Sequence, residues 1–108
     1  MFRTSNVGQI ANQAALELAK AKVAGFFCLA GVGAHIKGMV KSGKEADLMV
    51  AIDGCPMQCA AKTLQHVEIE PAIQVIVTEF GIEKSHDIAL DEKACLKVVE
   101  RVKEELAS

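Results

Sequence analysis

Near the start of the chain, apolar residues recur every three or four positions, which is the spacing of one face of a helix. Val7 and Ile10 begin this pattern. Asn6, followed three residues later by Gln9, resembles a capping box, a pairing that marks the start of a helix. We therefore predict a helix over residues 7–21.

Three short runs further along the chain are mostly apolar. They are VAGFFCLAG (residues 23–31), ADLMVAID (residues 46–53) and QVIVTE (residues 74–79). Short apolar runs bounded by turn signals are typical of buried strands. Because the first two lack a regular polar face, they indicate strands that are covered on both sides, as in a parallel sheet. The first strand is expected to end near Cys28.

Helical patterns separate and follow these runs. We predict a short helix that ends at KSGK (residues 41–44), a helix that starts at Pro56, and a closing helix over residues 91–107. This alternation predicts an α/β fold: one small layered domain spanning residues 1–108, with a mainly parallel sheet of three or four strands flanked by helices. The chain opens with a helix, so the first strand expected of such a sheet is predicted to be missing.

Composition and charge exclude several classes of protein. The 108 residues carry a net charge of −2 without a basic stretch, which argues against nucleic acid as a partner. No apolar stretch approaches the roughly 20 residues of a membrane span, and the start does not resemble a signal peptide. We therefore predict a cytoplasmic protein that does not bind membranes. Whether an exposed sheet edge pairs with a second copy in a homodimer stays open.

Four cysteines are the clearest candidates for chemistry: Cys28, Cys55, Cys59 and Cys95. In the cytoplasm thiols stay reduced, so these residues indicate metal binding, reactivity or burial before disulfides. Cys28 closes the first predicted strand and Cys55 follows the second, so both are expected at the carboxyl edge of the sheet. Cys95 falls on the apolar stripe of the closing helix, where a free cysteine acts as a small apolar residue.

The stretch between the second strand and the next helix shapes the predicted site. Gly54 permits a tight turn, and Pro56 fits the first position of a helix, so Cys55 is the predicted N-cap. Cys59 lies four residues on, on the same helix face, and the positive end of the helix favours the thiolate of Cys55. Asp53 either braces this turn or orients a ligand from behind it.

Three functions remain open for these thiols. The first is a zinc-type site formed by Cys28, Cys55 and Cys59. The second is a thiol-based redox protein or enzyme in which Cys55 attacks and Cys59 resolves. The third is an interaction domain with inert thiols. For a fourth zinc ligand the candidates are His35, which follows the glycine loop after Cys28, and His86, in the loop after the third predicted strand.

Several blocks of the chain resemble the DGC-domain family of small prokaryotic proteins. They are SNVGQIANQAA, FCLAGVGAH, DGCPMQCAAKTL and VTEFGIEKSHD, in this order. The resemblance implies zinc binding by four cysteines, without an assigned reaction, and Cys28, Cys55 and Cys59 match three of the four positions. The fourth belongs to a Cys-Ser-Gly stretch before the first block, where this chain has MFRT, and Cys95 does not match it. The resemblance therefore implies a three-thiolate site that water or His35 completes.

Overall fold

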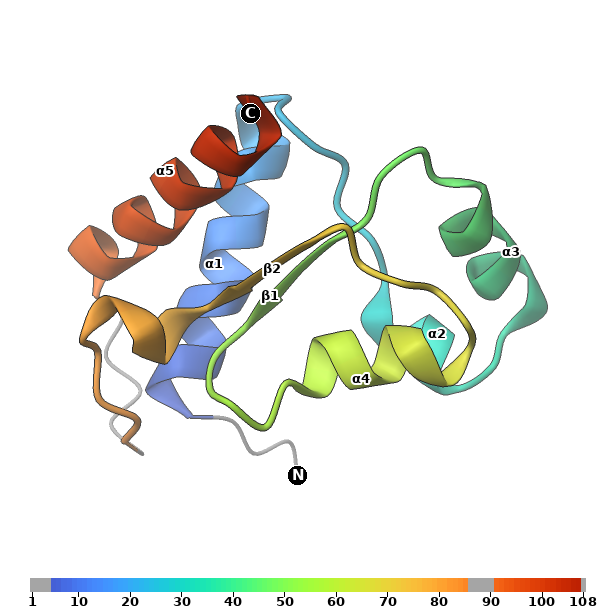
Figure 1. Ribbon diagram of the computed structural model, residues 1–108, viewed down its shortest axis with the longest axis horizontal. Helices are drawn as coiled ribbons and strands as arrows, with labels where there is room; N and C mark the ends of the chain where they lie inside the picture. The colour runs from blue at the N-terminus through green and yellow to red at the C-terminus, as the bar shows by residue number, and fades with distance from the viewer. Residues whose placement is uncertain (1–4, 86–90, 108) are drawn as a thin grey trace.

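The computed structural model describes residues 5–85 and 91–107. At its centre lie two parallel strands, β1 (Val50–Asp53) and β2 (Ile73–Ile76), in which Val50 faces Ile73 and Asp53 faces Ile76. Both strands therefore end at the same edge of the sheet. The predicted α/β fold is confirmed, with helices on both sides of a small parallel sheet (Figure 1).

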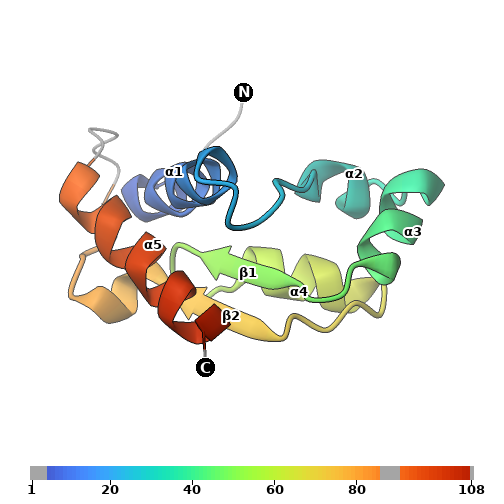
Figure 2. The same cartoon turned by 90° about the horizontal axis from the view of Figure 1, so that it is seen from above.

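Two groups of helices cover the sheet. Helices α1 (Asn6–Lys20) and α5 (Glu92–Ala107) pack against each other and against one side of the strands. Helix α4 (Cys59–His66) packs on β1 from the other side, together with α2 (Leu29–Gly33) and α3 (Lys37–Glu45) (Figures 1 and 2). Each group has its own apolar core, so the sheet separates two clusters of buried side chains.

The first and last helices agree with the predictions. Helix α1 buries Val7 and Ile10 as expected, and α5 spans nearly the whole predicted segment. The cap of α1 differs by one residue, because its N-cap is Ser5, whose Oγ accepts a hydrogen bond from the Gly8 N–H at 3.3 Å. Asn6 is instead the first helical residue, and its side chain bonds elsewhere.

The predicted number of strands is wrong, because the described residues form two strands rather than three or four. The first apolar run does not form a strand: residues 25–28 lack regular secondary structure, and α2 begins within the run. Its side chains are not buried on both faces as a central strand requires, since Val23 is 38% and Phe26 53% exposed. Phe27 packs inward beside Gly43 of α3, and Leu29 does so from the first turn of α2, so the part before α2 serves as a connection between helices.

The third predicted strand is also shorter than expected. It pairs only over β2, after which the 3₁₀ helix η1 (Val77–Phe80) turns the chain away from the sheet. Gly81 ends this turn with a φ of 79°, a left-handed conformation that glycine adopts without strain. The chain then passes along the start of α1.

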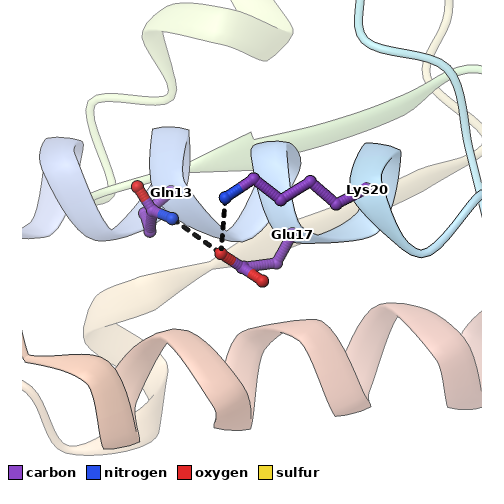
Figure 3. Close-up of polar contacts among 3 residues, drawn as sticks. All are labelled: Gln13, Glu17 and Lys20. Atoms are coloured by element: carbon purple, nitrogen blue, oxygen red, sulfur yellow. Dashed lines mark hydrogen bonds and ion pairs between the residues drawn. The ribbon is translucent and has the colours of Figure 1, made fainter.

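Cys95 lies between α1 and α5, as predicted for a core residue, and is 4% exposed. Burial raises the pKa of this thiol, and the carboxylates of Asp91 and Glu17 raise it further. Glu17 is held on α1 by Gln13, whose Nε2 donates to it at 2.8 Å, and by Lys20 at 3.6 Å (Figure 3). Cys95 therefore stays protonated in the folded chain and is not a candidate nucleophile.

The prediction that the protein does not span a membrane can be compared with the helices of the structure. Among the described residues, no helix has the length and apolar character needed to cross a bilayer. The homodimer through an exposed sheet edge is not tested by a single chain and stays a prediction.

Candidate thiol site at the carboxyl end of β1

Gly54 begins the turn that leaves β1, and it touches α1. A Cβ on Gly54 would lie 2.7 Å from the Gly8 nitrogen and 2.7 Å from the Val7 carbonyl carbon, both backbone atoms. The Gly54 carbonyl accepts a hydrogen bond from the Thr78 N–H in η1 at 3.2 Å. This residue therefore joins three elements at the place where Cys55 leaves the strand.

The segment after Gly54 is a turn rather than the predicted start of a helix. The Gln58 N–H donates to the Cys55 carbonyl at 3.0 Å, and Gln58 has a left-handed backbone with a φ of 55°. Helix α4 begins only at Cys59, so the predicted helix start at Pro56 is wrong, and Cys55 is not its N-cap. The physical reason is Gln58, since a left-handed residue cannot continue a right-handed helix.

Asp53 caps α4 from the end of β1. Its Oδ1 accepts from the Ala60 N–H at 2.6 Å and its Oδ2 from the Ala61 N–H at 3.1 Å, and the residue is only 6% exposed. A carboxylate at this end of a helix also matches the positive pole of the helix dipole. Asp53 therefore has the bracing role. Its carboxylate occupies the start of α4, the helix end that was expected to stabilise the Cys55 thiolate.

Cys55 has a charged neighbour that the sequence did not indicate. The Lys84 ammonium donates to the Cys55 sulfur at 3.7 Å, and the thiol is half-buried against the cluster of α1, α5 and β2. The structure therefore places a basic side chain, rather than the end of a helix, next to the Cys55 sulfur.

Asn6 holds the segment that carries Lys84. Its side-chain amide donates to the Glu83 carbonyl at 2.9 Å, and its Oδ1 accepts from the Ser85 N–H at 2.6 Å. The Asn6 N–H in turn donates to the Ser85 carbonyl at 3.0 Å. These three bonds fix the backbone on both sides of Lys84 to the first turn of α1, directly beside the turn that carries Cys55.

Cys28 and Cys59 are exposed thiols at the start of two neighbouring helices. Cys28 is the N-cap of α2, and Cys59 is the first residue of α4. The two helices pack together, with the methyl of Thr63 3.7 Å from the position of a Cβ on Gly33. The Cys28 sulfur lies over its own helix, beside Gly31.

His35, the predicted fourth zinc ligand, lies at the other end of α4. Its ring packs edge to face on His66, the last residue of α4, with the ring centroids 5.1 Å apart. His66 follows Cys59 by seven residues, which is about 10 Å along a helix. The structure therefore places His35 at the end of α4 remote from Cys59, and His86 lies outside the described residues.

The three cysteines do not form a prepared zinc site. Within the described ranges, no group of three or more histidine, cysteine or acidic side chains is close enough to hold a metal ion. Their sulfurs are nevertheless the donors that zinc prefers, and in the described structure none is in a disulfide. The donor chemistry thus fits zinc, whereas the arrangement of Cys28, Cys55 and Cys59 does not fit it as it stands.

Comparisons with known proteins identify relatives of the chain. The sequence matches the DGC domain over residues 3–102. It is 35% identical over 82 residues to the "Anaerobic and virulence modulator AnvM" of Pseudomonas aeruginosa, an alignment that covers 76% of this chain and 63% of that protein. The chain thus spans less than two thirds of the length of this relative. No solved structure matches the chain.

Proposed function

The chain belongs to the DGC-domain family, and we propose that within this family it acts through a reactive thiol, Cys55. The observation that carries the proposal is the contact of 3.7 Å between the Lys84 ammonium and the Cys55 sulfur. Reactive cysteines sit in electropositive, partly exposed surroundings, whereas inert ones are buried among apolar groups. Cys55 has the first kind of surroundings and Cys95 the second.

The reaction class that suits this site is thiol–disulfide exchange. The Cys55 thiolate attacks one sulfur of a disulfide, forms a mixed disulfide, and releases the other sulfur as a thiolate. Cys59, four residues on, then attacks the Cys55 sulfur and releases the second thiolate. Two cysteine thiols become one disulfide while the attacked disulfide becomes two thiols, so atoms and electrons balance.

The name of the AnvM relative supports a regulatory use of this chemistry. That protein is described as an anaerobic and virulence modulator. The supply of oxygen changes the balance between thiols and disulfides, and a cysteine pair can record that balance. In this proposal the chain is a regulator whose thiol site changes state, rather than an enzyme with a fast turnover.

Replacing Lys84 by methionine is expected to slow the alkylation of Cys55 at neutral pH by about fivefold, because the sulfur loses a neighbouring positive charge. The measurement is the rate of iodoacetamide labelling at Cys55, followed by peptide mass spectrometry. Lys97→Met, an exposed lysine on α5, is the matched control and should leave the rate unchanged. An equal rate in Lys84→Met and the unmodified chain would exclude the proposed role of the lysine.

Zinc binding is the second candidate function, and the donor chemistry of Cys28, Cys55 and Cys59 favours it. In this candidate the three thiolates hold the ion, which links the turn after β1 to the starts of α2 and α4. This candidate predicts that the reduced, purified chain carries one zinc per molecule by elemental analysis, that Cys28→Ser and Cys59→Ser lose it, and that Cys95→Ala keeps it. Absence of zinc, together with no rise in Tm on adding zinc, would exclude this candidate.

A further inference from the structure

A second concentration of functional groups lies at the far end of α4, where neither candidate thiol function uses it. The connection after α2, helix α3 and the end of α4 surround an open hollow of about 620 Å³. Its volume is within the range of small-molecule sites in proteins, about 300–1,000 Å³. Three features of its lining indicate what kind of molecule it holds.

The first feature is a row of lysines. Lys37, Lys41 and Lys44 all line the hollow, and their spacing places them on one face of α3. Like charges at such spacing weaken a helix, and Lys37 at its first position opposes the helix dipole. No acidic residue stands in the first turn to offset this charge. Helix α3 therefore carries a row of positive charge along the wall of the hollow. This charge lowers the stability of the helix itself.

The second feature is the edge-to-face pair of His35 and His66 at one end of the same hollow. His35 has a left-handed backbone with a φ of 59°. Such a conformation costs energy in a residue with a Cβ. Both imidazoles can donate hydrogen bonds from ring nitrogens, so this end of the hollow adds neutral or positive donors to the lysines.

The third feature is the balance of charge and apolar surface. Glu45 and Glu68 also line the hollow, so three lysines against two carboxylates leave a charge of +1 before any histidine is protonated. The Glu45 carboxylate is 4.0 Å from the Lys41 ammonium, which partly offsets its negative charge. Val40 and the buried Val67 supply apolar surface. The positive excess is unfavourable for a metal cation and favourable for an anion.

We propose that this hollow binds a small molecule that carries phosphate groups. Phosphate oxygens accept charge-assisted hydrogen bonds from lysine, which binds phosphate as a point charge, and accept further bonds from imidazole donors. The hollow is larger than a single phosphate needs, and the two valines offer a surface for an apolar or flat part of the ligand. The site is separate from Cys55, so its loading can be measured independently of the thiols.

Calorimetric titration of the full chain with inorganic pyrophosphate and with adenosine diphosphate tests this proposal. We expect a Kd below about 1 mM for at least one of them. Lys41→Gln and His66→Gln should each weaken binding by about fivefold or more, because each removes a donor to the phosphates. Lys97→Gln on α5 is the matched control and should leave binding unchanged. Circular dichroism of each variant establishes that the helices are retained.

The outcomes separate the sources of affinity and decide the proposal. Equal affinity for both compounds means that phosphates alone are recognised. Tighter binding of adenosine diphosphate means that the base contacts the apolar surface of Val40 and Val67. Both results support the site. Absence of binding at millimolar concentration overturns it. Binding that persists unchanged in the folded variants Lys41→Gln and His66→Gln also overturns the proposal. So does a chain with alkylated thiols that binds zinc through its histidines but does not bind either phosphate compound.

Discussion

Gly54→Ala is expected to lower the free energy of unfolding by about 3 kcal/mol, since overpacking a site without room forces the backbone to shift. The new methyl group would stand 2.7 Å from the backbone of Val7 and Gly8. These atoms belong to the first turn of a helix whose side chains form the main core, so they cannot move away without disturbing that core. Urea unfolding followed by the circular dichroism of the helices measures the loss.

Gly38→Ala is the matched control for this substitution. A Cβ on Gly38 meets nothing within 4 Å, and this glycine lies inside α3. Alanine there should stabilise the helix by about 0.5–1 kcal/mol, because glycine is the poorer helix former. If both variants changed stability in the same direction and by similar amounts, the close contact between Gly54 and α1 would not be a property of the protein in solution.

Asp53→Asn is expected to cost about 2–3 kcal/mol, the range for losing a hydrogen bond to a charged group and leaving a buried donor unpaired. The two carboxylate oxygens accept from the N–H groups of Ala60 and Ala61. An asparagine has one oxygen, so its NH₂ group would face an N–H group and one bond would be lost. Urea unfolding gives the loss of stability, and amide hydrogen exchange at Ala60 and Ala61 locates it.

The exposed Asp47 provides a comparison for this variant. Asp47→Asn removes the same charge from the surface and should change stability by less than about 0.5 kcal/mol. If Asp53→Asn were as mild as Asp47→Asn, or if exchange at Ala60 and Ala61 were unaffected, Asp53 would not hold the start of α4.

Periodicity was enough to predict the elements whose apolar residues face one core. Helix α1 follows from it, because Val7 and Ile10 repeat at helical spacing and are buried, and the buried residues of α5 repeat in the same way. The run at residues 23–31 is apolar at seven of its nine positions but splits between a connection without regular secondary structure and a short helix. A short apolar run does not specify which elements will cover it, and here those elements leave Phe26 exposed.

The candidate site was only partly predictable for a related reason. Sequence spacing indicated that Gly54 forms a turn and that Asp53 could brace it, because both effects are local. Nothing in the sequence indicates that Gln58 adopts a left-handed backbone. This conformation places the start of the helix at Cys59 instead of next to Cys55. Lys84 was missed because 29 residues separate it from Cys55, and contacts between distant parts of the chain, among them the bonds of Asn6, bring the two together.

The most direct measurement of the central claim compares the cysteines of the unmodified, reduced chain. Limiting iodoacetamide at neutral pH, followed by peptide mass spectrometry, gives a rate for each thiol. Because of the Lys84 ammonium, Cys55 should react first although it is less exposed than Cys28 and Cys59, and Cys95 should react last. If the exposed Cys28 and Cys59 both outpaced Cys55, exposure alone would govern the thiols and Cys55 would not be the reactive group.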